Sequence, residues 1–253
     1  PISLIAATRN TDELAFVVGH EAAHHILNHI EQKSGAAAAG AVILSGISSA
    51  GASDWPAIGR LDSGKSVCSA VLIAPDRVLT AAHCVSLSDG TPFPAGSIVF
   101  RAGRSQGTEV AQSVAGRVVL HPDYRPGAEA KSRLASDIAL VELLTPLRVP
   151  PIPAEEALLP PDEMTAITYS RQQPEEPPQV LSCPLLRRSL GALLIDCAVT
   201  GGASGAPLIA GPFGAERLVG IVVARGEAQG RGIAFAVPVA DALPTLQNAA
   251  RAP

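Results

Sequence analysis

The stretch that decides the fold is Val78 to Cys84, which reads VLTAAHC. Its first residues predict a short apolar strand, the two alanines predict a tight turn, and the turn ends on His83 beside Cys84. A lone histidine in such a place is most often a buried side chain that backbone groups satisfy. His83 becomes a candidate general base if the chain also holds the serine and the carboxylate that acyl transfer requires.

The serine candidate is Ser204, within the run TGGASGAP at residues 200–207. Glycines on both sides let backbone amides approach a substrate carbonyl, because a Cβ at those positions would clash with it. An apolar pair, Leu208 and Ile209, predicts that a strand follows the turn. An ordinary glycine-rich turn would also fit this run taken alone. The assignment of Ser204 as the nucleophile therefore depends on the histidine segment that precedes it in the chain.

The carboxylate candidate is Asp137, which opens the run DIALVEL at residues 137–143. Asp123, in HPDY at residues 121–124, is the competitor, but its neighbours are typical of a surface turn. We therefore assign to Asp137 the role of orienting the imidazole. The chain order His, Asp, Ser differs from the order in subtilisin-like and α/β-hydrolase enzymes.

These segments resemble the trypsin superfamily, whose LTAAHC box is matched residue for residue and whose DIAL strand is matched at residues 137–140. The resemblance covers roughly residues 55–246. It implies an all-β fold of two six-stranded antiparallel barrels with the active site between them. It also implies a serine endopeptidase that needs no cofactor, in which Gly202 and Ser204 supply the two oxyanion N–H groups.

The residue pattern after Trp55 is typical of an all-β fold, because short runs rich in Val, Ile and Leu alternate with clusters of turn-forming residues. The clearest runs are residues 70–73, 77–79, 97–101, 115–120, 138–143 and 218–224. The proline-rich run RQQPEEPP at residues 171–178 predicts an exposed connection between two β halves. We divide the chain into an N-terminal helical segment, 1–52, and a protease domain, 53–253.

The four cysteines are even in number and lack the short CxxC spacing of zinc knuckles. Two disulfides and an oxidising compartment are therefore favoured, which predicts a secreted or periplasmic protein. The trypsin resemblance implies a bridge from Cys68 to Cys84 beside the catalytic histidine, and it leaves Cys183 and Cys197 as the second pair. The spacing of that second pair departs from vertebrate trypsin and is closer to the bacterial branch related to glutamyl endopeptidases.

A second protease motif, HExxH, lies at residues 20–24. On a helix it places His20 and His24 one turn apart to bind zinc, while Glu21 serves as the base. Its context resembles zinc metallopeptidases of the M48 type, which take a third ligand from a glutamate in a later helix. The sequence after Ala52 offers no convincing counterpart. An incomplete metallopeptidase fragment without zinc is favoured, with a zinc site as the alternative.

The Ala/Gly-rich run at residues 35–52 has the length of a marginal membrane span, but alanine, glycine and serine drive insertion weakly. Membrane association is therefore not expected. The end of the run, AGA at residues 50–52, also mimics a signal-peptidase site, and cleavage there would release the protease domain.

Composition limits the possible partners. A chain that is 47% hydrophobic and 17% charged is too apolar for a disordered protein. A net charge of −4 gives no basic field for a polyphosphate, and 3% aromatic residues leave little for base stacking, so nucleic acid is not expected. We expect a monomer that acts on proteins or peptides.

Two other functions stay open. A non-catalytic binding module could keep the trypsin fold, although such proteins usually lose a triad residue and none is missing here. A zinc metallopeptidase could arise from the HExxH segment.

The resemblance also locates the wall of the specificity pocket. The position of trypsin's specificity acid falls near Ala198, so cleavage after Lys or Arg has no obvious counter-charge. Val222, Val223 and Ala224 are apolar, and Arg225 is the nearby charge. We predict a small or medium apolar P1 residue, with an acidic P1 residue bound by Arg225 as the alternative.

The residue before the nucleophile, Ala203, stands where trypsin-like zymogens carry an aspartate that pairs with a newly cut amino terminus. Because alanine carries no charge, the oxyanion loop is expected to be ordered by its own backbone and by the Cys197 bridge.

Overall fold

The computed structural model describes residues 55–252, apart from residues 65, 155–159, 190 and 213. The N-terminal segment 1–52, with the HExxH motif and the Ala/Gly-rich run, lies outside the described residues. Strands dominate the described part of the chain, as the sequence predicts for an all-β fold.

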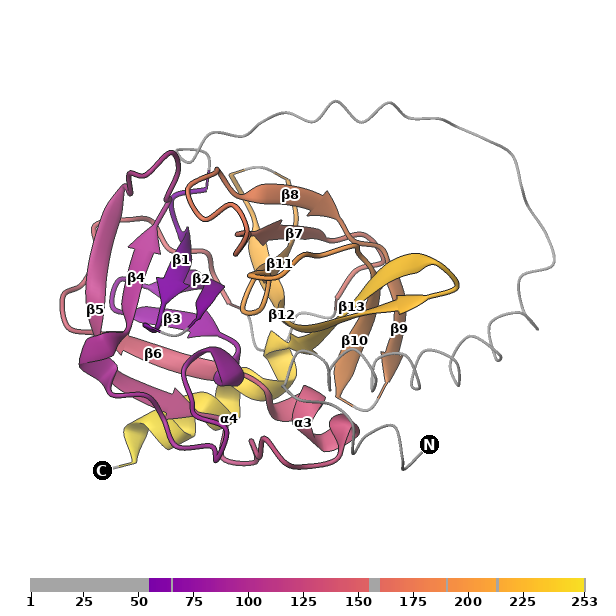
Figure 1. Ribbon diagram of the computed structural model, residues 1–253, viewed down its shortest axis with the longest axis horizontal. Coiled ribbons are helices and arrows are strands. Elements are labelled where there is room, and N and C mark those ends of the chain that lie inside the picture. The colour runs from indigo at the N-terminus through magenta and orange to yellow at the C-terminus, as the bar shows by residue number, and fades with distance from the viewer. Residues whose placement is uncertain (1–54, 65, 155–159, 190, 213, 253) are drawn as a thin grey trace.

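The first half is a closed antiparallel barrel of six strands in the order β1-β2-β3-β6-β5-β4 (Figure 1). Its strands are β1 (Ile58–Asp62), β2 (Val67–Ala74), β3 (Arg77–Thr80), β4 (Val99–Ala102), β5 (Ala111–Leu120) and β6 (Ala139–Leu143). The barrel closes through β1, which pairs with β2 on one edge and with β4 on the other. Fully buried side chains such as Phe100 and Leu72 fill its interior, and burial of this apolar surface is the main driving force for its formation.

The second half is an antiparallel sheet in the order β8-β7-β11-β12-β13-β10-β9. Its strands are β7 (Thr165–Thr168), β8 (Gln179–Ser182), β9 (Leu185–Ser189), β10 (Ala192–Asp196), β11 (Pro207–Ala210), β12 (Arg217–Ala228) and β13 (Arg231–Pro238). The sequence predicts six strands in this half, whereas the structure has seven.

The extra strand arises because one strand is split at Pro184. The edge strands β8 and β9 follow one another in the chain, separated only by Cys183 and Pro184. β8 pairs with β7 at one edge of the sheet, and β9 pairs with β10 at the other edge. Because β8 and β9 are consecutive in the chain, the two edges of the sheet approach one another. Proline has no N–H group to donate to a ladder, which explains the interruption at this point.

The proline-rich run 171–178 does not connect the two halves. It lies between β7 and β8, within the second half, and residues 144–164 form the true connection. The run is held against the first barrel, because the backbone N–H of Gln106 donates to the Glu175 carbonyl and Arg104 forms an ion pair with the Glu175 carboxylate at 2.6 Å.

Four short helical elements complete the described chain: η2 (Ala82–Cys84), η3 (Ala95–Ser97), α3 (Ala130–Ser136) and α4 (Val239–Arg251). α4 buries an apolar face that includes Leu243 and Leu246, and it contacts strands of both halves. From the first barrel, the Arg117 guanidinium donates to the carbonyls of Ala250 and Ala252 near the end of α4. None of the helices in the described ranges is long and apolar enough to cross a membrane.

Gly59 on β1 marks a point where the first barrel leaves no room for a side chain. An added Cβ would lie 2.4 Å from the Arg101 carbonyl oxygen and 2.6 Å from a ring carbon of Phe100. We predict that Gly59→Ala lowers the free energy of unfolding by about 1–3 kcal/mol, measured by urea denaturation, because overpacking strains the barrel. Exposed Gly96 has no atom within 4 Å of an added Cβ, and Gly96→Ala should change stability by less than about 0.5 kcal/mol. Equal losses in the two variants would contradict this account of the barrel.

Candidate active site

His83 and Asp137 come from the ends of two paired strands of the first barrel. β3 leads into the η2 turn that carries His83, and Asp137 precedes β6, with Thr80 registered opposite Ala139. Asp137 Oδ2 lies 2.8 Å from His83 Nδ1, and Oδ1 accepts the backbone N–H of His83 at 2.9 Å. This two-point contact fixes both the ring and the backbone of the histidine. The Asp137 side chain is only 7% exposed, so water competes little for its carboxylate.

Asp123, the competing carboxylate, has a different place. It is exposed, and its backbone N–H and carbonyl take part in a local turn through His121 and Ser136. The structure therefore brings Asp137, and not Asp123, to the imidazole.

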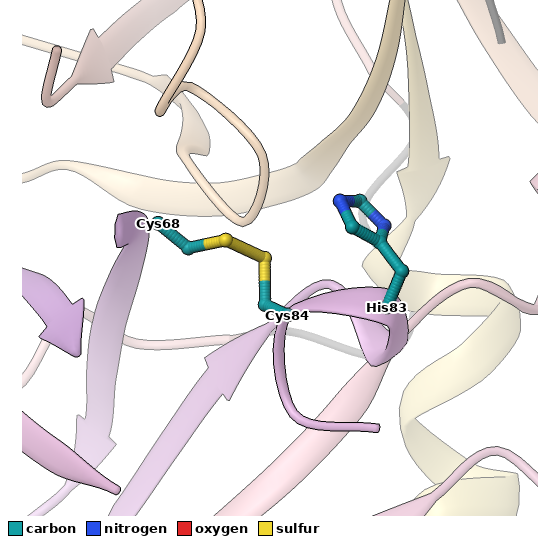
Figure 2. A group of neighbouring side chains, drawn as sticks. All are labelled: Cys68, His83 and Cys84. Carbon is teal, nitrogen blue, oxygen red and sulfur yellow. A yellow bond between two sulfur atoms is a disulfide. The ribbon is translucent and has the colours of Figure 1, made fainter. Parts of the chain in front are cut away.

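The predicted bridge between Cys68 and Cys84 is present and joins β2 to the η2 turn. Figure 2 shows His83 and Cys84 projecting from the same turn, with the disulfide running from Cys84 to Cys68. The ligand atoms of these three residues lie within 4.8 Å of one another, and the described ranges hold no other such cluster of three. Because the two sulfur atoms are bonded to each other, neither is a thiolate that could bind a metal ion. The second predicted disulfide, Cys183–Cys197, is also present.

Ser204 lies in the loop between β10 and β11, and this loop rests against the first barrel. The Ser204 carbonyl accepts the Ser69 N–H of β2 at 2.8 Å, and Gly205 N–H donates to Val222 at 2.7 Å. Gly205 has φ +82°, and a Cβ there would lie 2.1 Å from the Ser69 carbonyl oxygen and 2.2 Å from Thr80 Oγ1. Only glycine fits this junction.

The backbone around Ser204 has two N–H groups without an acceptor among the described residues. Ala203 N–H donates to Thr200, whereas the N–H groups of Gly202 and Ser204 donate to no acceptor among the residues that the structure describes. The Gly201 carbonyl accepts Arg171 N–H at 2.7 Å, and none of the peptide bonds of the described residues is cis. In a trans peptide the carbonyl and the N–H point in opposite directions, so this contact turns the Gly202 N–H away from Arg171.

Ser69, which the sequence analysis missed, holds this loop from the first barrel. Its fully buried hydroxyl donates to the Gly202 carbonyl at 2.9 Å and accepts the Tyr169 N–H at 2.8 Å. The only signal in the sequence was that Ser69 directly follows Cys68, the cysteine expected to bridge to the histidine turn.

One cleft contains most of the predicted site residues. The triad candidates, Gly202, Val222, Val223, Ala224 and Arg225 all line it. Ala198 is exposed and is not among the lining residues; Val199 and Thr200 stand there in its place. Three further arginine and aromatic side chains that the sequence analysis did not single out also line the cleft, namely Tyr124, Arg133 and Arg171.

Tyr124 is a neutral group beside the buried carboxylate. Burial, and then the negative charge of Asp137, raise the pKa of the Tyr124 phenol well above its usual value, although a hydrogen bond with Ser86 opposes the shift. The phenol therefore keeps its proton at any physiological pH.

Two family models match the chain. The model described as Trypsin matches residues 44–246, and the model described as Peptidase family M48 matches residues 2–84. The two matches share residues 44–84, and residues 58–84 of that overlap form the first three strands of the barrel and the histidine turn.

Two named relatives are similar to the chain in sequence. Serine protease 56 of Homo sapiens is 33% identical over 143 residues, which is 56% of this chain and 20% of the relative. Serine protease 56 of Mus musculus is 32% identical over 152 residues, which is 60% of this chain and 22% of the relative. The chain thus spans about a fifth of the length of these relatives.

Solved structures share the fold. A thermostable serine protease, AL20, from an extremophilic microorganism has a TM-score of 0.65 at 19% identity, covering 78% of this chain and 97% of its own. The protease Anisep from Arthrobacter nicotinovorans has a TM-score of 0.64 at 16% identity with the same coverage. A Glu endopeptidase has a TM-score of 0.63 at 20% identity, covering 79% of this chain and 92% of its own.

The two disulfides allow a matched test of what holds the His83 turn. They close loops of similar separation, 16 and 14 residues, so removing either pair should cost about 3 kcal/mol in the free energy of unfolding. Only Cys68→Ala/Cys84→Ala should also speed hydrogen exchange at the His83 N–H, because that bridge pins the turn on which the N–H meets Asp137. Equal protection at His83 in this variant and in Cys183→Ala/Cys197→Ala would show that the bridge does not position the turn.

Proposed function

The chain belongs to the trypsin family of serine proteases, and from that premise we propose that it is a serine endopeptidase that cleaves peptide bonds through an acyl-enzyme on Ser204. The observation that carries the proposal is the two-point contact of Asp137 with His83 inside the cleft that Ser204 also lines.

In this mechanism His83 acts first as a base and then as an acid during formation of the acyl-enzyme. Asp137 binds Nδ1, so the other ring nitrogen, Nε2, is left to accept the Ser204 proton and then to protonate the leaving amine. Asp137 keeps the ring in this tautomer and stabilises the imidazolium that forms, without taking a proton itself.

The N–H groups of Gly202 and Ser204 would bind the oxygen of the tetrahedral intermediate. Their value depends on being fixed before the reaction, because reorientation during the reaction would consume the stabilisation that they provide. The contacts of Arg171 and Ser69 with the loop supply that fixed orientation.

The loop needs no charged amino terminus for this order. Ala203 is 1% exposed and belongs to an apolar cluster with Val199, Cys183 and Cys197. An ammonium group placed there would be buried without a carboxylate, at a large cost in free energy. Activity should therefore not depend on a defined N-terminus.

The walls of the cleft favour a small or medium apolar P1 residue. Val222, Val223 and Ala224 are buried and apolar, and Asp137 is the single carboxylate among the described lining residues. Arg225 is exposed and lines the cleft, and an acidic P1 residue bound by it is the alternative. One of the structures of similar fold is a Glu endopeptidase.

The mechanism uses no cofactor. Zinc binding at His20 and His24, with Glu21 as the base, is the alternative for the segment outside the described residues, where an incomplete metallopeptidase fragment without zinc is favoured. Metal analysis and the effect of a chelator on hydrolysis distinguish it from serine catalysis. The complete triad argues against a non-catalytic binding module.

The two disulfides indicate an oxidising compartment. We propose a secreted or periplasmic enzyme that acts as a monomer on proteins or peptides.

A fluorophosphonate probe tests the proposed function directly. The folded protein should become labelled on Ser204, located by peptide mass spectrometry, and Ser204→Ala should neither label nor hydrolyse casein. The activated serine is what reacts, so a folded protein that stays unlabelled would overturn the proposal.

Ser69→Ala tests how the oxyanion loop is held. The variant leaves the Gly202 carbonyl and the Tyr169 N–H without their buried partner, so kcat for a peptide ester should fall about 10- to 100-fold with little change in KM. The matched control is Ser113→Ala, since Ser113 is also a buried serine of the first barrel and accepts the Thr145 N–H at 3.1 Å. Ser113 does not line the cleft, and its variant should lose stability while keeping kcat. A fall in kcat of equal size in both variants would reduce Ser69 to a general structural role.

A further inference from the structure

Arg133 is a buried cation that the proposed mechanism does not use. It lies on α3, is 7% exposed, and lines the cleft together with Tyr124 and Leu134. Its Nη1 donates to the Pro126 carbonyl at the long distance of 3.5 Å. Within the described residues, no carboxylate lies within 4 Å of the Arg133 guanidinium.

Other partly buried arginines of this chain have carboxylate partners. Arg104, with a side chain 12% exposed, pairs with Glu109 and Glu175, and Arg60, at 15%, pairs with Asp62. Burying a guanidinium without a counter-charge is costly, so a protein places one in such a position only where something compensates it. At Arg133 the side that is open to a partner is the cleft.

The described lining of the cleft differs in charge from the chain. Arg133 and Arg225 line it, against one described carboxylate, Asp137, which already binds His83. The chain has a formal net charge of −4. A concave surface with a local excess of positive charge attracts anionic ligands, and low-dielectric walls strengthen the attraction.

We propose that the cleft recognises substrates with an acidic side chain on the N-terminal side of the P1 residue, and that Arg133 binds the carboxylate. This inference rests on the proposed endopeptidase function. Arg133, Tyr124 and Leu134 belong to the first half, like His83, whereas Val222 to Ala224, which we assign to P1, belong to β12 of the second half. A peptide held at Ser204 between the two sides can place a flanking carboxylate against the guanidinium. The planar fork of arginine suits a carboxylate better than a single ammonium would.

The test compares fluorogenic peptides that share one apolar P1 residue and carry either Glu or its neutral isostere Gln at P2, P3 or P4. With the full chain, kcat/KM for the Glu peptide should exceed that for the Gln peptide by about 10- to 100-fold at one of these positions, as expected for hydrogen bonds to a charged group. Arg133→Met should bring this Glu/Gln ratio close to one. Arg133→Lys keeps the charge but loses the fork, and it should give an intermediate ratio.

Two control variants remove the same charge elsewhere. Arg148 is exposed and lies outside the cleft lining, and Arg148→Met should keep the ratio of the unaltered protein. Arg225→Met should keep it too, because Arg225 directly follows the apolar residues that we assign to P1. A Glu/Gln ratio near one in the unaltered protein, a ratio that persists in Arg133→Met, or a ratio lost in Arg225→Met alone would each overturn the proposal.

Active-site labelling separates this inference from the proposed function. Protein that labels on Ser204 but shows no Glu/Gln preference retains the endopeptidase function and overturns the acidic subsite. Protein that does not label overturns both. If Arg133→Met does not fold, Arg133→Lys and the ratio in the unaltered protein still decide the question.

Discussion

The active-site geometry depends on the hydrogen bonds that Ser69 makes where the two halves meet. Its backbone N–H binds the Ser204 carbonyl, and its hydroxyl binds both the Gly202 carbonyl and the Tyr169 N–H. These contacts fasten the nucleophile loop of the second half to β2 of the first. The approach is so close that Gly205 has no space for a Cβ. Because the site is buried, each unsatisfied group would cost the full free energy of desolvation, which makes the arrangement specific.

The histidine and its carboxylate are fixed by different means, within the first barrel alone. Pairing of β3 with β6 brings the ends of both strands together, and the Cys68–Cys84 bridge holds the turn after β3. His83 and Asp137 therefore belong to one structural unit and the Ser204 loop to another. The junction at Ser69 joins the two units beside the cleft. This division explains why a protease of this fold places its chemistry between halves rather than inside one of them.

Ion pairs also link the two halves of the protein. Ion pairs from Arg60 and Arg104 to Glu175 hold the 171–178 run against the first barrel, and Arg171 in that run supports the oxyanion loop through its backbone. Carboxylates thus neutralise the charges of Arg60 and Arg104. Arg133, which lines the cleft, stands apart from this pattern, since no described carboxylate lies within 4 Å of its guanidinium.

The sequence by itself predicted the all-β class and the triad candidates, because each is encoded in short runs whose residues lie close together along the chain. It predicted the Cys68–Cys84 bridge through the resemblance of those runs to the trypsin superfamily. VLTAAHC contains the strand, the turn, the base and a cysteine within seven positions. Only the tertiary structure decided that Ser69 supports the oxyanion loop, that Arg133 faces the cleft and that Ala198 does not. Ser69 meets Tyr169 and Gly202 across 100 and 133 positions, and a local pattern carries no information about contacts at such separations. The split strand at Pro184 could likewise not be predicted from a local pattern, since its two parts pair with opposite ends of one sheet.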